Sequence, residues 1–199
     1  MAVKLINKPT IYVVGRSTVD HRAVGALLND LNASAWTSDA KTSGDLLPEI
    51  AGRLCYLSFG SPRPGGNSTY ISHILDVGHG SVLEHSTWNF VFTGVSRSFT
   101  HELVRHRVGM SYSQVSQRFV DESDVAFVVP PALRGNESYV ERFRQSCERA
   151  TADYKLLSES LYAEYENIAD KTLRRKRARE AARCVLPNAT ETKIFVTAN

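Results

Sequence analysis

Short apolar runs alternate with longer amphipathic stretches along the chain, a pattern that predicts both strands and helices. The clearest strand signal lies in 86–93, where Trp88, Phe90 and Phe92 fall on alternate positions and face one side. A strand of this kind is half buried, with one face on a core. Strands are expected at residues 3–6, 11–14, 86–93 and 193–197.

Helices are predicted where apolar residues recur every three or four positions. Ser96 is a suitable N-cap for a helix that runs to about His106, and Pro187 stops a helix that begins near Lys171. The longest expected helix carries one apolar stripe of Tyr139, Phe143, Cys147, Ala150, Tyr154, Leu157 and Leu161. The helices expected are 21–31, 46–54, a short one around 71–75, 96–106, 138–165 and 171–185.

Glycine and proline in 60–68 break both patterns and predict a loop, and the polar residues of 109–117 predict another. Strands and helices do not alternate as they do in a regular parallel sheet. The chain therefore predicts an α+β fold with a central mixed or antiparallel sheet flanked by helices. Its 199 residues carry no internal repeat, so a single domain over 1–199 is expected.

The composition is that of a globular protein, with 42% hydrophobic residues, 23% charged residues and a net charge of +3. An 18-residue apolar run and a secretory signal pattern are both missing, which favours a cytoplasmic protein with no membrane partner. Cys55, Cys147 and Cys184 are far apart and are expected to be buried thiols in a reducing compartment. The glycine-rich nucleotide-binding motifs and the nucleophile elbow are absent from the sequence.

Charged residues gather on the helix expected at 96–106. Arg97, His101 and Arg105 repeat every fourth residue and share a face, and Glu102 lies three residues before Arg105. Cations suit the C-terminal end of a helix even without a ligand. The spacing is therefore compatible with an anion site and with a solvated helix end.

The segment that follows is rich in hydroxyl and amide side chains, running from Ser111 to Gln117 and closing with Arg118. Such a segment offers many hydrogen bonds to a phosphate or a pyrimidine. A surface loop has the same composition, so both interpretations stay open.

Two further groups could carry chemistry. Lys176, Arg179 and Arg183 share one face of the helix expected at 171–185, which is compatible with a solvated face or with an RNA-binding helix. The segments HGS at 79–81 and EH at 84–85 combine a flexible backbone with histidines. Their spacing matches no common metal-ligand pattern, so no metal is expected, and a turn with surface histidines explains them equally well.

At Arg105-His106-Arg107, followed by Ser116 and Arg118, the chain resembles the flavin-dependent thymidylate synthases. The hallmark of that family is RHR, a short spacer, and then a serine and an arginine. Family-like segments occur in family order from about Leu46 onward: RLCY at 53–56, DVGHGSVLEH at 76–85, GVSRSFTHELVRHR at 94–107 and AARCVLPNATET at 181–192. The resemblance implies the fold of the thymidylate synthase-complementing proteins.

The resemblance also implies binding residues, position by position. Those it assigns to FAD and to the folate-binding face of the flavin are Ser81, Arg105, His106, Arg107, Asn199 and His79. Those it assigns to dUMP are Arg97, Glu102, Gln114, Ser116, Arg118 and Arg183, with Lys176 and Arg179 in the same basic pocket and Tyr56 at its edge. Ser116 and Arg183 would position the substrate, and no residue is assigned as a covalent nucleophile.

The implied activity is the reductive methylation of dUMP to dTMP. NADPH would reduce FAD, and methylenetetrahydrofolate would supply the carbon. The cofactor carries the difficult chemistry, while cationic side chains stabilise negative charge on the uracil ring. Family members form their sites between the subunits of a homotetramer, and no nucleic acid is expected as a partner.

The chain departs from the family pattern at three places. The spacer VGMSYSQV is one residue longer than usual, Phe119 stands where many members have tyrosine, and the sequence stops at Asn199, before a helical stretch that carries further dUMP and flavin ligands in the family. An alternative is therefore a relative that binds FAD or dUMP with weak or no turnover. A nucleic-acid-binding module that uses 105–107 and 171–183 is the third hypothesis.

Overall fold

The computed structural model describes residues 2–61 and 64–199 and divides them into two compact units. The prediction of a single domain concerns how the chain folds as a whole, and it stays a prediction. Among the described helices, none is long and apolar enough to cross a membrane. Unit 1 comprises the residues up to Tyr12 with Val91–Arg107 and Tyr112–Val196, and unit 2 comprises the described residues of Val13–Phe90 with Val108–Ser111 and Thr197–Asn199.

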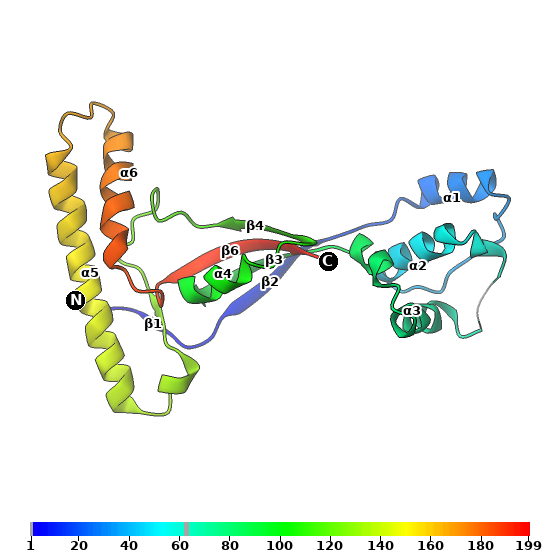
Figure 1. The fold of residues 1–199 in the computed structure, drawn as a ribbon, viewed down its shortest axis with the longest axis horizontal. Helices are drawn as coiled ribbons and strands as arrows, with labels where there is room; N and C mark the ends of the chain where they lie inside the picture. Colours follow the sequence, from blue (N-terminus) through cyan, green and yellow to red (C-terminus); the bar gives the residue numbers. More distant parts are fainter. Residues whose placement is uncertain (1, 62–63) are drawn as a thin grey trace. The chain divides into compact units, whose positions relative to one another are not determined.

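A four-stranded sheet supplies residues to both units (Figure 1). Its strand order is β2 (Thr10–Arg16), β3 (Trp88–Ser96), β6 (Glu191–Ala198) and β4 (Met110–Gln114). Backbone hydrogen bonds join Val115 to Lys193 and Asn199 to Gly109, so β4 and β6 run in opposite directions. This confirms the α+β fold with an antiparallel sheet and the strands expected near 11–14, 86–93 and 193–197.

The prediction of a polar loop at 109–117 is wrong for its first half, because Met110–Gln114 forms a strand. Its residues alternate between partly buried and exposed, as a strand requires, but the inward positions include Tyr112 and Gln114. The sequence pattern therefore looked polar throughout. Gln114 is accommodated because its amide donates to the hydroxyl oxygens of Thr100 (2.8 Å) and Thr192 (3.3 Å).

The helices of unit 1 are α4 (Arg97–Leu103), α5 (Glu137–Glu164) and α6 (Lys171–Ala182), with 3-10 turns at Pro131–Leu133 and Arg183–Val185. The long helices α5 and α6 pack side by side (Figure 1). Cys147 and Tyr154 of the predicted stripe are buried, whereas Tyr139 at its start is exposed. A short parallel pair, β1 (Leu5–Ile6) and β5 (Phe127–Val128), completes the unit.

Unit 2 contains α1 (His21–Asp30), α2 (Ser43–Cys55) and α3 (Gly66–Asp76), with 3-10 turns at Ser58–Gly60 and Gly80–His85. The loop expected at 60–68 is too long, since α3 begins inside it, and residues 62–63 lie outside the described part. Tyr70, Ile74 and Val82 form a buried cluster. Pro48 lies inside α2 and cannot donate to the Gly44 carbonyl, which instead accepts from the Ser86 hydroxyl.

The expectation of three buried cysteines is wrong for two of them. Cys147, within α5, is 1% exposed. Cys55 is the last residue of α2 and Cys184 lies in the turn after α6, and both are exposed. Both positions are at the end of an element, where the chain turns away from the packed face.

Candidate functional site

A polar cavity of about 420 Å³ opens in unit 1 beside α4, and we call it the first cavity. Its walls come from α4, from β4 and the residues after it, and from the segment that follows α6. Its polar and ionisable side chains are Arg97, Thr100, His101, Gln114, Gln117, Arg183, Cys184 and Asn188. Three of the residues predicted to bind substrate, Arg97, Gln114 and Arg183, are therefore brought together.

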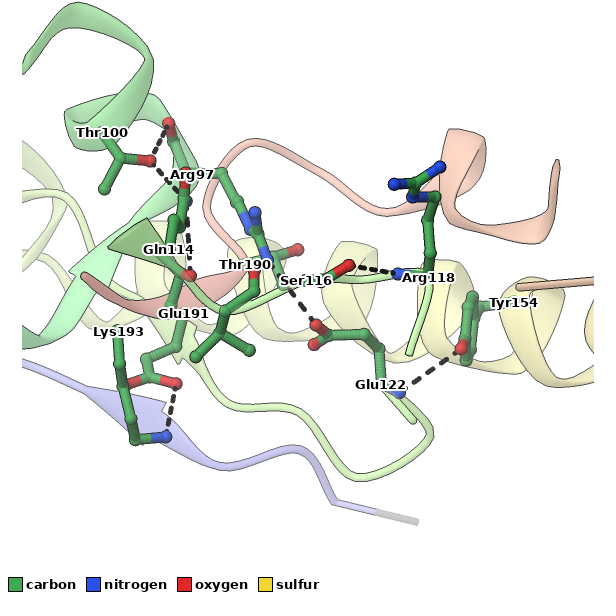
Figure 2. Close-up of polar contacts among 12 residues, drawn as sticks. Arg97, Thr100, Gln114, Ser116, Arg118, Glu122, Tyr154, Thr190, Glu191 and Lys193 are labelled. Atoms are coloured by element: carbon green, nitrogen blue, oxygen red, sulfur yellow. Dashed lines mark hydrogen bonds and ion pairs between the residues drawn. The ribbon is translucent and has the colours of Figure 1, made fainter. Parts of the chain in front are cut away.

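Arg97 is the most constrained cation of the first cavity. Its backbone donates to the Thr190 carbonyl at 2.9 Å, which ties the start of α4 to the turn before β6. One guanidinium nitrogen, Nη2, donates to the Val115 carbonyl at 2.8 Å and lies 3.8 Å from Glu122 Oε1 (Figure 2). The Nε atom is buried without a hydrogen-bond partner among the described residues. Burial lowers the pKa of Arg97, opposed by the nearby Glu122 carboxylate.

Ser116 and Arg118 follow β4 in the same unit. The Ser116 hydroxyl accepts from the Arg118 backbone at 3.3 Å, which closes a tight turn. The Arg118 guanidinium lies 3.5 Å from Glu180 on α6 and its side chain is 41% exposed. Neither residue lines the first cavity. Arg118 keeps enough exposed surface for an anion to reach it.

The three basic residues predicted on one face of α6 have different surroundings. Arg183, at the end of the helix, lines the first cavity. Arg179 donates to the Phe119 carbonyl at 2.8 Å and pairs with Asp121 at 2.7 Å. Lys176 lies 5.0 Å from the centre of the Phe119 ring. The structure thus places Lys176 and Arg179 against the segment 119–121, outside the first cavity.

The Arg105-His106-Arg107 segment follows the C-terminal end of α4, and all three side chains are exposed. The Tyr112 hydroxyl of β4 lies within hydrogen-bonding distance of the carbonyls of Leu103 and His106. Leu103 is the last residue of α4, and its carbonyl also accepts from the His106 backbone at 3.1 Å, while His106 lies in the turn that follows the helix. Glu102 is also exposed on α4 and does not line the first cavity.

Four predicted residues belong to unit 2. The ring of Tyr56 is stacked on that of His79, with 6.1 Å between their centres, and the two side chains approach to 3.5 Å. Ser81 is exposed in the 3-10 turn that follows. Asn199 donates from its backbone to Gly109 at 3.3 Å.

A second cavity of about 540 Å³ lies in unit 1, and its lining includes Glu122 and Glu191 as well as Lys4, Lys8 and Lys193. Glu122 is 3% exposed, and burial raises its pKa, an effect that Arg97 opposes and Glu191 increases. Figure 2 shows the Arg97 side chain extending towards the Glu122 carboxylate. Arg97 lines the first cavity and Glu122 lines the second, so this ion pair links a residue of one cavity to a residue of the other.

Sequence reasoning assigned no role to His101, Cys184 and Glu122, which are among the residues that the structure places at these cavities. His101 could have been found, since it shares a face with Arg97 one helical turn earlier. Cys184 follows Arg183 directly, but the apolar residues near it predict a buried thiol. Glu122 carries no sequence signal, because its approach to Arg97 depends on how distant segments pack.

Comparisons with known proteins give consistent results. Residues 39–199 match the family model described as thymidylate synthase complementing protein. Flavin-dependent thymidylate synthases from Mycolicibacterium gilvum and from Mycobacterium tuberculosis strain H37Rv are each 49% identical to this chain over 166 residues. The match covers 82% of this chain and 66% of each relative, so the chain spans just under two thirds of their length.

Solved structures with a similar fold are more distant in sequence. A UMP/dUMP methylase, PolB from Streptomyces cacaoi bound with 5-Br dUMP, has a TM-score of 0.64 at 22% identity, over 99% of this chain and 75% of that chain. Thymidylate Synthase X from Helicobacter pylori with FAD and dUMP has a TM-score of 0.50 at 22% identity, over 96% of this chain and 78% of that chain. At this identity the likeness concerns the fold alone.

Proposed function

The chain belongs to the thymidylate synthase complementing protein family, and from that premise we propose that it is a flavin-dependent thymidylate synthase that methylates dUMP to dTMP. The observation that carries the proposal is the first cavity, where Arg97, Gln114 and Arg183 converge. Its volume of about 420 Å³ lies in the range of small-molecule sites. Two arginines and an amide are suitable partners for a phosphate and a pyrimidine.

The Arg97 side chain supports a polar ligand in the first cavity, because it lines that cavity and 19% of its surface remains exposed. Gln114 is oriented by Thr100 and Thr192, so its amide is held in place at the cavity wall. Ser116 and Arg118 lie in the turn after β4, and we assign them to the same nucleotide as positioning groups. We assign Glu102 and Lys176 of unit 1 to the same nucleotide, and Tyr56 of unit 2 as a further dUMP contact.

The exposed cations at 105–107 suit the pyrophosphate of FAD, which is an anion that guanidinium groups bind well. We assign FAD contacts to Arg105, His106 and Arg107 of unit 1 and, independently, to Ser81, His79 and Asn199 of unit 2. FAD, when bound, supplies the redox chemistry, with NADPH and methylenetetrahydrofolate as co-substrates. The residues of this chain bind and orient, and the arginines stabilise negative charge on the uracil ring.

Family resemblance further supports a homotetramer whose sites are completed between subunits, acting in the cytoplasm. Residues assigned to one reaction fall in both units, which is compatible with sites assembled from more than one segment. The proposal includes neither a metal nor a nucleic acid.

The visible absorption spectrum of the purified protein tests the proposal directly. After incubation with FAD and removal of the excess, a flavin spectrum should be retained, and dUMP should perturb it. Turnover with dUMP, methylenetetrahydrofolate and NADPH should then yield dTMP. Retained flavin with a dUMP response but no dTMP would indicate a binding relative without activity. Tight, flavin-independent binding of nucleic acid that falls steeply with salt would contradict the proposal.

A further inference from the structure

The contact between Arg97 and Glu122 does not have the geometry of a close salt bridge. Nη2 of Arg97 donates to the Val115 carbonyl at 2.8 Å, while Glu122 Oε1 lies 3.8 Å away, beyond hydrogen-bonding distance. The guanidinium is thus fixed at one nitrogen and attracted by the carboxylate beside it. This arrangement leaves Nε without a partner and the other donors near the first cavity.

Glu122 is itself held rigidly. Its backbone N–H donates to the Tyr154 hydroxyl at 3.3 Å, and Tyr154 is completely buried on α5. The side chain of Glu122 is 4% exposed and that of Arg97 is 19% exposed. A buried carboxylate on a fixed backbone has few orientations available, so it defines where a neighbouring cation lies.

The stability of the fold does not account for this pair. Burial raises the pKa of Glu122 even though Arg97 and Lys193 favour its charged form, and Glu191 and Asp121 oppose it. Burial also lowers the pKa of Arg97. Each charge is therefore unfavourable where it lies, as is common for buried ion pairs, whose desolvation can exceed their attraction.

We propose that Glu122 is a positioning residue, whose carboxylate holds the Arg97 guanidinium at the wall of the first cavity so that dUMP meets an arginine already in place. The inference rests on the proposed function, because it assumes that the first cavity binds dUMP. A long side chain that is ordered before binding loses less conformational entropy when the ligand arrives.

The test is a double-mutant cycle on the dissociation constant for dUMP, measured by titration calorimetry on the purified chain saturated with FAD. The variants are Glu122→Gln, Arg97→Met and the double variant. In the unmodified chain, Glu122→Gln should raise the Kd for dUMP about tenfold. In the Arg97→Met background, the same substitution should raise the Kd less than about twofold. Its melting temperature should equal or exceed that of the unmodified chain, because a neutral amide replaces an unfavourable charge.

Glu191→Gln is the matched control. Glu191 lines the same second cavity, but its carboxylate accepts from the Gly94 backbone at 2.9 Å and lies 3.5 Å from Lys193. Both substitutions remove one negative charge near Arg97, which by itself would favour an anionic ligand. Only Glu122→Gln removes the carboxylate that positions the Arg97 guanidinium, so only this variant should bind dUMP more weakly.

Several outcomes would overturn the inference. One is an unchanged or lower Kd for Glu122→Gln. Another is a lowered melting temperature with an equal loss of dUMP affinity in both backgrounds, which would show a merely structural role. If the unmodified chain does not bind dUMP, the proposed function fails first and the inference fails with it, and this result is visible before any variant is made.

Discussion

The ionised form of Glu122 is unfavourable to the fold, and this has a measurable consequence at the scale of one residue. Its ordinary pKa is 4.5, and burial raises it in the folded state. A folded state that holds a proton more tightly than the unfolded chain loses stability as pH rises. Four charged groups face the carboxylate and determine how far its pKa is raised, and therefore the pH range over which stability is lost: Arg97, Lys193, Glu191 and Asp121.

We therefore expect the contribution of Glu122 to the free energy of unfolding to fall as pH rises from 4.5 through the raised pKa. Urea denaturation of the unmodified chain and of Glu122→Gln, at several pH values from acidic to neutral, measures the difference. The variant should be relatively more stable at neutral pH and should gain nothing at the acidic end. A constant difference across the series would show that Glu122 does not titrate in this window.

Arg118→Ala should weaken dUMP binding. The loss of a charge-assisted contact to the phosphate is worth about 1.5–3 kcal/mol, which is roughly a ten- to hundredfold rise in Kd. Arg142→Ala, which removes an exposed arginine from α5, is the control and should leave the Kd unchanged. An unaltered Kd in the Arg118 variant would remove this residue from the site.

At the scale of elements, β4 connects the proposed nucleotide and flavin residues. Tyr112 contacts the carbonyl of Leu103, the last residue of α4, and that of His106 within the exposed segment 105–107, and Gln114 contacts Thr100 within the helix. Both are inward-facing polar residues of one short strand. The strand therefore fixes the end of α4 through side chains.

Tyr112→Phe should lower the free energy of unfolding by about 1 kcal/mol, because the hydroxyl that contacts the carbonyls of Leu103 and His106 is lost. It should also reduce FAD retention, since the residues at 105–107 lose the contact that orders the turn before them. Tyr139→Phe, at an exposed position of α5, provides the matched control and should change neither quantity. Full FAD retention in the Tyr112 variant would show that the turn is ordered by other contacts.

The elements that the sequence predicted well are those whose periodicity reports burial directly. The stripe of α5 includes the buried Cys147 and Tyr154, β3 covers the segment whose apolar residues alternate, and Ser96 caps α4 through a hydrogen bond from Phe99. β4 was missed because its inward side chains are polar and are satisfied by tertiary partners. Three of the predicted substrate residues meet in the first cavity, whereas the place of Glu122 beside Arg97 depends on packing that no local pattern encodes.

At the scale of the whole molecule, each long strand of the sheet contributes residues to both units. The residues proposed for the reaction are likewise divided, with the first cavity in unit 1 and Tyr56, His79 and Ser81 in unit 2. The integrity of unit 2 depends on a buried pair in α2. Arg53 Nε donates to Glu49 Oε1 at 2.8 Å, and the two side chains are 4% and 2% exposed.

Arg53→Met should destabilise the protein by about 3–5 kcal/mol, because it leaves the Glu49 carboxylate buried without its cation. The measurement is chemical denaturation of the full chain. Arg144→Met breaks an exposed pair with Glu141 on α5 and should cost less than about 0.5 kcal/mol. Similar losses in the two variants would mean that burial does not govern the contribution of these pairs.

The close approach of Asn199 to Gly109 affects which amino-acid substitutions are tolerated just before β4. Gly109 has a φ of +69°, and a Cβ atom there would lie 2.1 Å from Asn199 Oδ1. The backbone conformation therefore strains any residue other than glycine, and a Cβ atom would in addition displace the end of the Asn199 side chain. In a saturation scan, position 109 should reject small, polar and apolar residues alike. Any suppressor is expected at Asn199, ninety residues away in sequence, rather than among the chain neighbours of the glycine.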